Sequence, residues 1–275
     1  MRRIAVAMVL LFAACAPSGL ASSPPLASPP TMLSDARAAL ATVTTVAALG
    51  DSVPTGTACD CTPYPLLSGT DLQRALGHHV GVDNDAVPGT TSVDVLRQIQ
   101  QDSETVRDVA NSQAVLVEVG ANDVAYSAQC GTDASCYAAE VPNVTKNLRK
   151  IVDRLHALTS AHPVAVVLLD YWSVWLGGQY ETAQGSAYVE AAEDVTTSVN
   201  DAIRAVARDT GSIYVDVRTA FRGANNDDDE TNLLAPDGDH PNAAGHRRIA
   251  DAVAAAVNDY EASSASTSVL RNQSA

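Results

Sequence analysis

Residues 141–169 read VPNVTKNLRKIVDRLHALTSAHPVAVVLL and contain the clearest structural signal in the chain. Over the first 18 of these residues, apolar side chains recur at steps of three and four, which places them on one face of a helix. The last six form a short apolar run rich in β-branched residues, as in a buried strand. The stretch therefore predicts an amphipathic helix, Val141–Leu158, followed by a strand, Val164–Leu169.

The same alternation of strand and helix recurs on both sides of this unit. Helical periodicity returns at residues 183–208 and 241–260. Four further strands are expected at Val43–Leu49, Val80–Val87, Ala114–Val119 and Ser212–Val217. Strands that alternate with helices pair in parallel through crossover connections. We therefore predict one α/β domain, a three-layer α/β/α sandwich around a five-stranded parallel sheet.

The two ends of the chain differ from this body. Residues 1–15 carry Arg2 and Arg3 directly after Met1 and continue as an apolar run too short to span a bilayer, which is typical of a secretory signal. Residues 16–35 are rich in Pro, Ser and Ala and predict an extended linker. The domain is expected at 36–260 and a flexible tail at 261–275. The leader predicts an extracytoplasmic protein.

Two cleavage sites fit this leader. Phe12-Ala13-Ala14-Cys15 resembles a bacterial lipobox, in which Cys15 would be lipidated and would attach the protein to the membrane of the cell envelope. A cut after the small-x-small triplet that ends at Ala21 would instead release a secreted protein. Both remain open.

Export also changes how the five cysteines are interpreted. With Cys15 in the leader, an even number remains for disulfides in an oxidising compartment. These candidates are Cys59, Cys61, Cys130 and Cys136. The spacing favours Cys130 with Cys136, because a Cys59–Cys61 bridge would close a very small ring. Pairing between the two segments is the alternative.

The charge of the chain excludes some partners. Acidic side chains number 32 against 17 basic ones, giving a formal charge of −15, and −17 once the first 15 residues with their two arginines are removed. Such a surface disfavours nucleic acids and other polyanions. The sequence contains no glycine-rich motif of the kind that binds nucleotides. The acidic run 225–230 fits a solvated loop better than a calcium-binding loop. We therefore expect no metal and no cofactor, and we expect the protein to be a monomer.

Polar residues follow the predicted strands where a parallel sheet collects its functional groups. Ser52 follows the first strand, and a serine hydroxyl needs an imidazole to take its proton. His240 can do so, and Asp237, three residues earlier, can hold the far ring nitrogen. Candidate oxyanion donors are the N–H groups of Ser52 and Gly89 and the amide of Asn122.

In this order, these segments resemble the SGNH or GDSL-type serine hydrolase family, in its secreted bacterial form. The specific motifs are ALGDSVP at 48–54, GAND at 120–123 and DGDHPN at 237–242, and the resemblance covers roughly residues 45–258. It implies a flavodoxin-like sheet and a metal-free esterase or lipase. Ser52 would be the nucleophile, His240 the base and Asp237 its partner, with Ser52, Gly89 and Asn122 as the oxyanion hole. Val53 departs from the family's usual Leu, and the block around Gly89 is poorly defined.

The sequence thus predicts hydrolysis of carboxylic acyl esters through an acyl-enzyme on Ser52. The alternatives are removal of acetyl groups from polysaccharides on the same fold, and a non-catalytic binding lipoprotein of the envelope. Four aromatic residues, Tyr171, Trp172, Trp175 and Tyr180, follow the fourth predicted strand. We expect them to wall the substrate pocket; the alternative is that they pack a loop onto the body.

Overall fold

The structure is a computed structural model that describes residues 36–272 and, for side chains, residues 36–262. The predicted leader, linker and lipidation site, Cys15 included, lie outside the described residues. Five strands form one sheet in the order β2-β1-β3-β4-β5, and all neighbouring pairs are parallel. The strands are β1 Thr45–Gly50, β2 Gly81–Asn84, β3 Ala114–Glu118, β4 Ala165–Leu169 and β5 Ile213–Val215.

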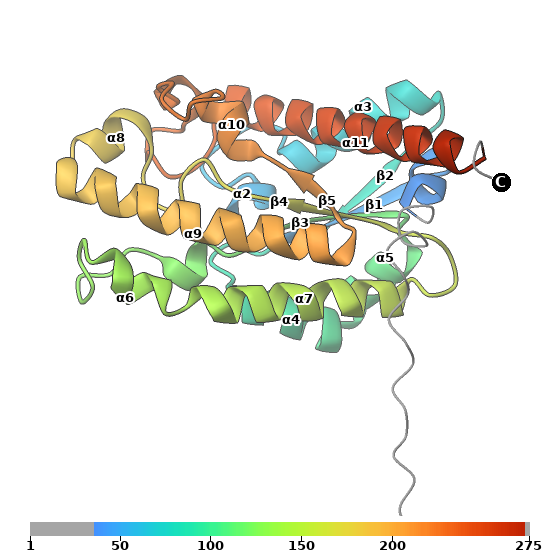
Figure 1. Ribbon diagram of the computed structural model, residues 1–275, viewed down its shortest axis with the longest axis horizontal. Coiled ribbons are helices and arrows are strands. Elements are labelled where there is room, and N and C mark those ends of the chain that lie inside the picture. The colour runs from blue at the N-terminus through green and yellow to red at the C-terminus, as the bar shows by residue number, and fades with distance from the viewer. Residues whose placement is uncertain (1–35, 273–275) are drawn as a thin grey trace, which may run out of the picture.

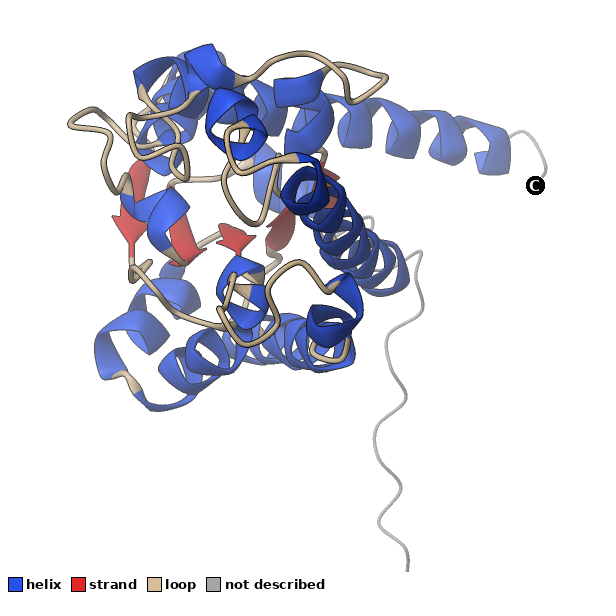
Figure 2. Ribbon diagram, turned by 90° about the vertical axis from the view of Figure 1, so that its left-hand side faces the viewer, coloured by secondary structure: helices blue, strands red, loops and turns tan. Residues whose placement is uncertain are grey.

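Helices cover both faces of the sheet (Figures 1 and 2). One layer contains α3 Tyr64–Leu76, α10 Val217–Arg222 and α11 Ala243–Asn272. The other contains α4 Ser92–Gln101, α5 Ser103–Asn111, α7 Val141–Leu158 and α9 Ser186–Thr210. Short elements in the connections are α2 Ser52–Thr55, η1 Ala121–Val124, α6 Ala134–Ala138, α8 Gly178–Thr182 and η2 Thr231–Leu233. This strand order and layering is the flavodoxin-like arrangement.

The apolar periodicity explains the packing. Helix α7 has the predicted bounds and buries the predicted face, with Leu148 and Ile151 at its centre. Strands β3 and β4 are buried along their whole length, as expected for parallel strands covered on both faces. The predicted three-layer sandwich with five parallel strands is confirmed. The strand bounds differ from the prediction by at most three residues, and β1 ends at Gly50, one residue beyond its predicted end.

The C-terminal end differs from the expectation. Helix α11 runs to Asn272, so the backbone after Tyr260 is helical where the sequence led us to expect a flexible tail. The reason is local: residues 261–272 contain no Gly or Pro that would end the helix. The remaining domain boundaries stay predictions.

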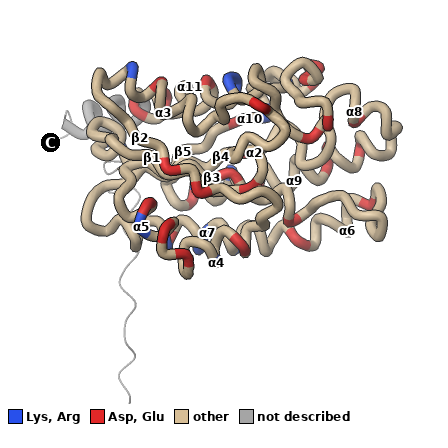
Figure 3. The backbone as a smooth tube through the Cα atoms, turned by 180° about the vertical axis from the view of Figure 1, so that it is seen from behind, with Lys and Arg blue, Asp and Glu red and all other residues tan. Residues whose placement is uncertain are grey.

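Charges are distributed over both helical layers. Acidic positions are spread along the described backbone and outnumber basic ones, including near the ends of the central strands (Figure 3). Within the part of the chain that the structure describes, we find no helix with the length and apolarity to cross a membrane.

Candidate active site

The end of β1 places Ser52 at the carboxyl edge of the sheet. Asp51 caps the short helix α2, because its Oδ1 accepts the N–H of Val53 at 3.1 Å. Ser52 is the first helical residue, so its own N–H has no acceptor in that helix. Gly50 must be glycine here: a Cβ would lie 2.0 Å from the carbonyl oxygen of Glu118 on β3. This close contact fixes the Ser52 segment against the neighbouring strand.

The turn after β3 places Asn122. Its Nδ2 donates one hydrogen bond to the carbonyl of Thr90, at 3.0 Å, which leaves the second amide proton available. Asp123 holds the turn by accepting the hydroxyl and N–H of Ser92 at 2.6 and 2.8 Å. Asn122 lines the same cavity as Ser52.

Of the three predicted oxyanion-hole residues, Gly89 is the one that does not line this cavity, and Asp237 of the predicted triad lies outside its lining as well. It is exposed, with φ +79°, in the turn that follows β2. Within residues 36–272 its N–H makes no hydrogen bond. The next residue ties the turn to the site, because the Thr90 hydroxyl donates to the Gly50 carbonyl at 2.8 Å and its carbonyl accepts from Asn122.

His240 and Asp237 come from the loop before α11. His240 Nδ1 lies 2.8 Å from Asp237 Oδ2, and the N–H groups of Asp239 and His240 both donate to Asp237 Oδ1 at 3.1 Å. Partial burial opposes the charge of Asp237, but the bonds from the His240 ring and the two N–H groups lower its pKa below the usual value. The carboxylate therefore stays ionised and fixes the proton of His240 on Nδ1, leaving Nε2 as the free base.

Ser52, Asn122 and His240 meet in one cavity of about 390 Å³. Of the four predicted aromatic residues, Tyr171, Trp172 and Trp175 line it and are almost fully buried. Tyr180 does not line the cavity; it packs where a Cβ on Gly238 would stand, under the His240 loop. Three of the four aromatic residues therefore wall the cavity, and the fourth packs a loop onto the body.

Further lining residues escaped the sequence interpretation. Tyr126 and Tyr188 pack against Trp175 with ring centroids 5.2 Å away, and Tyr126 is 47% exposed. Asp239 lines the cavity beside His240, and burial raises its pKa. Nothing in the local sequence marks the two tyrosines, because Tyr126 comes from a loop and Tyr188 from the first turn of the amphipathic helix α9.

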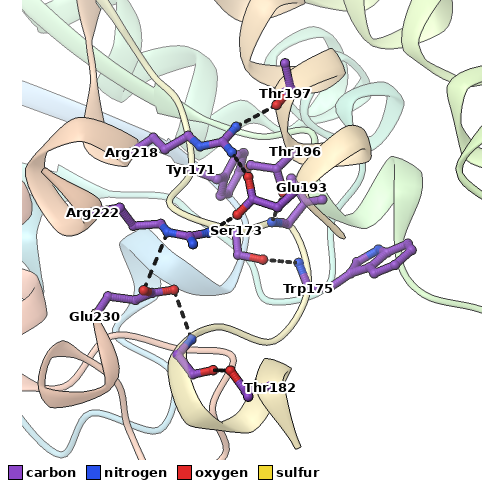
Figure 4. Close-up of polar contacts among 12 residues, drawn as sticks. Tyr171, Ser173, Trp175, Thr182, Glu193, Thr196, Thr197, Arg218, Arg222 and Glu230 are labelled. Carbon is purple, nitrogen blue, oxygen red and sulfur yellow. Dashed lines mark hydrogen bonds and ion pairs between the residues drawn. The ribbon is translucent and has the colours of Figure 1, made fainter. Parts of the chain in front are cut away.

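The segment that packs against the His240 loop is held by an arginine cluster, which we define as Arg218, Arg222, Glu193 and Glu230 (Figure 4). Both arginines bind the Glu193 carboxylate, and Arg222 Nε lies 3.6 Å from Glu230 Oε2. Glu230 Oε1 accepts the N–H of Gly178 at 2.9 Å. The preceding residue, Gly177, donates to the carbonyl of Gly238 at 2.9 Å. The cluster thus holds α8 against the loop that carries Asp237 and His240.

Glu230 corrects the expectation for residues 225–230. Asp227–Asp229 are exposed, as predicted for a solvated loop, but Glu230 is only 2% exposed. The sequence signal was present, because an acidic residue three positions before the apolar segment Leu233–Ala235 can be buried when a cation is near.

Beneath Ser52 lies a second group of buried acids, which we call the acid floor: Asp51, Glu118 and Asp170. Tyr171 donates its hydroxyl to Asp51 Oδ2 at 2.6 Å, and Tyr214 donates to Asp170. Burial is the main cause that raises the pKa of Asp51 to about 6 and that of Asp170 to about 7. The signal for Glu118 in the sequence is a lone charge inside the apolar run AVLVEVG.

The four predicted cysteines form two pairs. Cys59 is bonded to Cys61 and Cys130 to Cys136, with Cα atoms 5.0 and 5.8 Å apart. Pairing between the segments is therefore wrong for this structure, and Ala58 and Asp60, with positive φ, make the tight turn that the small ring needs.

In residues 36–262, the only cluster with metal-ligand spacing combines Cys59 and Cys61 with the buried His246. His246 Nδ1 accepts the N–H of Tyr64 at 3.3 Å, and burial lowers its pKa to about 4. Because the ring is neutral and its Nε2 carries the proton, it does not offer a lone pair to an ion beside the bonded sulfurs.

Comparison with solved structures agrees with this architecture. The lipase Lip_vut3 from a goat rumen metagenome has a TM-score of 0.63 at 16% identity, over 77% of this chain and 96% of that one. A catalytic variant of Axe2, an acetylxylan esterase from Geobacillus stearothermophilus, has a TM-score of 0.55 at 18% identity, over 78% and 94%. TesA has a TM-score of 0.53 at 18% identity, over 78% and 99%. At these identities the likeness establishes the fold.

The family follows from the sequence itself. A comparison with curated proteins gives no match. The pattern of the GDSL-like lipase/acylhydrolase family, however, matches residues 48–248, which include the Ser52, Asn122 and His240 motifs. The chain belongs to the GDSL-like lipase/acylhydrolase family, and it is a carboxylic ester hydrolase.

Proposed function

We propose that this protein is an extracytoplasmic serine esterase that cleaves acyl esters through an acyl-enzyme on Ser52. The observation that carries the proposal is the 2.8 Å contact between Asp237 Oδ2 and His240 Nδ1, with His240 and Ser52 on one cavity. A carboxylate, an imidazole and a hydroxyl in this order are the parts of nucleophilic acyl transfer.

In the first half-reaction, Ser52 Oγ attacks the ester carbonyl carbon while His240 Nε2 takes the hydroxyl proton. The charge that develops on the carbonyl oxygen is stabilised by the Ser52 N–H and the free amide proton of Asn122. We assign the third donor to Gly89, whose N–H is unbonded within residues 36–272 and whose turn is tied to Gly50 through Thr90. The intermediate then expels the alcohol, which receives the proton from His240.

In the second half-reaction, water attacks the acyl-serine. His240 takes a proton from that water and returns it to Ser52 Oγ as the carboxylic acid leaves. Asp237, whose pKa is lowered, stabilises the imidazolium in both steps.

The test uses Ser52→Ala on a short p-nitrophenyl ester, with Ser198→Ala as a matched control because Ser198 is a partly exposed serine on α9 that does not line the cavity. We expect Ser52→Ala to reduce kcat by on the order of 10⁴-fold or more, since removing the nucleophile removes the covalent path. The wild type and Ser198→Ala should be labelled by a fluorophosphonate, and Ser52→Ala should not. Substantial turnover or labelling of Ser52→Ala would refute the proposal.

A second candidate substrate is an acetyl group on a polysaccharide. Tyr126 presents an exposed ring at the cavity, and Ser173, Gln184 and Asp239 add polar groups that suit sugar hydroxyls. The acetylxylan esterase named above shares the fold. Comparing kcat/KM for acetylated xylooligosaccharides with that for p-nitrophenyl esters of rising chain length separates the two candidates.

Export and anchoring are part of the proposal and depend on the leader. With a lipid on Cys15 the enzyme would sit on the cell envelope, and with the later cut it would be secreted. Cys15→Ser should move the protein from the membrane fraction to the soluble fraction in the first case and change nothing in the second.

A further inference from the structure

Glu118 is a buried acid whose carboxyl group lacks a hydrogen-bond partner among the described residues. It ends β3 beside Gly50, its register partner on β1, and is 0% exposed. Within residues 36–262, neither of its carboxyl oxygens makes a hydrogen bond. An ionised carboxylate in this position would have lost its water without gaining donors, at a cost of several kcal/mol. The geometry therefore disfavours a charge on Glu118.

The groups that face Glu118 give it no cation. They are Tyr64 from α3, Asp51 from the junction of β1 and α2, and Asp170 and Tyr171 from the end of β4. Tyr64 interacts with Glu118 through its side chain, but its buried hydroxyl does not reach hydrogen-bond geometry. Burial first, and the charge of Asp51 second, raise the pKa of Glu118 well above its usual range.

Asp51 is better placed to hold a charge. Its Oδ2 accepts the Tyr171 hydroxyl at 2.6 Å and its Oδ1 accepts the N–H of Val53. Burial raises the pKa of Asp51 to about 6, while these two bonds oppose the increase. Above pH 6 the acid floor beneath Ser52 therefore carries the charge of Asp51, and two adjacent buried carboxylates cannot both ionise without strong repulsion.

We propose that Glu118 is a positioning residue for the nucleophile: as a neutral carboxylic acid it places no second charge beside Asp51, the residue that caps the helix of Ser52. Only Asp51 separates Glu118 from Ser52, because the Glu118 carbonyl accepts the Asp51 N–H at 3.2 Å and Asp51 caps the helix that begins with Ser52. Ionisation of Glu118 at alkaline pH places a second negative charge against Asp51 and displaces this cap.

The positioning role rests on the proposed function of Ser52, whereas the protonation of Glu118 does not. A direct measurement on the wild type is isotope-edited infrared spectroscopy with ¹³C-labelled glutamate at pH 8. That pH lies above the pKa of Glu181, which burial raises to about 7. We expect a protonated carboxyl band that disappears in Glu118→Gln; absence of the band in the wild type would overturn the proposal.

The second measurement compares Glu118→Gln with Glu190→Gln, an exposed control on α9. Folded Glu118 keeps its proton while the unfolded chain loses it above about pH 4.5, so the wild type loses stability as pH rises. The gain in Tm of Glu118→Gln over the wild type should therefore grow from pH 5 to pH 9, and Glu190→Gln should show no such trend. A Tm difference that is constant with pH would contradict protonation.

The third measurement separates positioning from stability. We expect Glu118→Gln to keep kcat/KM at pH 7 within about threefold of the wild type and to extend activity to higher pH. An unchanged alkaline limb would overturn the positioning role even if the infrared band confirmed the proton. If Ser52→Ala remained active while the band persisted, the proposed function would fail and the protonation of Glu118 would stand.

Discussion

The acid floor next to Ser52 and the arginine cluster next to the His240 loop compensate the charge of acidic side chains in opposite ways. In the arginine cluster, Arg218 and Arg222 bind Glu193, and Arg222 also faces Glu230. In the acid floor, no arginine or lysine bonds to Asp51, Glu118 or Asp170 through its side chain, within the residues described. There the hydrogen-bonding side chains are tyrosines.

The two regions differ in how a buried carboxyl group avoids an uncompensated charge, by an ion pair or by keeping its proton. In the arginine cluster two cations, Arg218 and Arg222, face the two carboxylates of Glu193 and Glu230. Glu181, another buried acid near the same arginines, forms no ion pair with them within residues 36–262, and burial raises its pKa to about 7 although the two cations oppose the increase. A buried carboxylate in this protein is thus neutralised by an arginine where one is available and by a proton where none is.

The largest effect should come from removing the cation that Glu230 faces. Arg222→Met keeps much of the side-chain volume but leaves Glu230 buried and uncompensated, so we expect the free energy of unfolding to fall by about 3–5 kcal/mol. Denaturant titration measures this change. Because Glu230 holds Gly178 and Gly177 holds the His240 loop, KM should rise as well.

The double variant Arg222→Met with Glu230→Gln tests the cause. Removing the stranded charge should recover part of the lost stability, whereas two independent losses would add. Arg97→Met is the matched control, since Arg97 pairs with Asp94 at the surface and its loss should cost about 0–1 kcal/mol. A loss for Arg222→Met as small as that of the control would break the comparison between the two regions.

The sequence predicted the sheet and the catalytic motifs because both depend on local signals. Helix α7 follows from its own apolar spacing, and Ser52, Asn122 and His240 follow from short motifs at strand ends. Tyr126 and Tyr188 were missed because only tertiary packing brings them to Trp175. Arg222 and Glu230 were missed for the same reason: the charge balance of a buried acid depends on neighbours from other elements.

A smaller effect is expected from the pH dependence of the acid floor. Asp170 accepts the Tyr214 hydroxyl and the N–H groups of Val217 and Arg218, yet burial outweighs these bonds and raises its pKa to about 7. From about pH 4 to pH 7 the folded protein therefore holds a proton that the unfolded chain has released. Stability conferred by this group is complete below pH 4 and is lost as pH approaches 7.

Asp170→Asn tests this directly, because an amide can accept from Val217 N–H and stays neutral. Between pH 4 and pH 7 the wild type should lose on the order of 3 kcal/mol of unfolding free energy through Asp170, and the variant should not. A plot of unfolding free energy against pH should therefore be flatter for Asp170→Asn than for the wild type. If the variant is instead destabilised equally at every pH, Asp170 is ionised in the folded state, and its three donors compensate its burial as an arginine would.

The smallest effect is expected at an exposed ion pair, where the carboxylate needs neither an arginine nor a proton to offset burial. Arg149 on α7 and Asp209 on α9 pair at 2.5 Å, but both side chains are well exposed. Water solvates such charges with or without the partner, and salt screens them beyond about 8 Å at 0.15 M. Arg149→Met should leave the unfolding midpoint unchanged within error at 0.15 M salt, with any effect confined to low salt. A loss as large as that of Arg222→Met would show that the bridge between α7 and α9, and not the burial of the acid, decides how much an ion pair stabilises this fold.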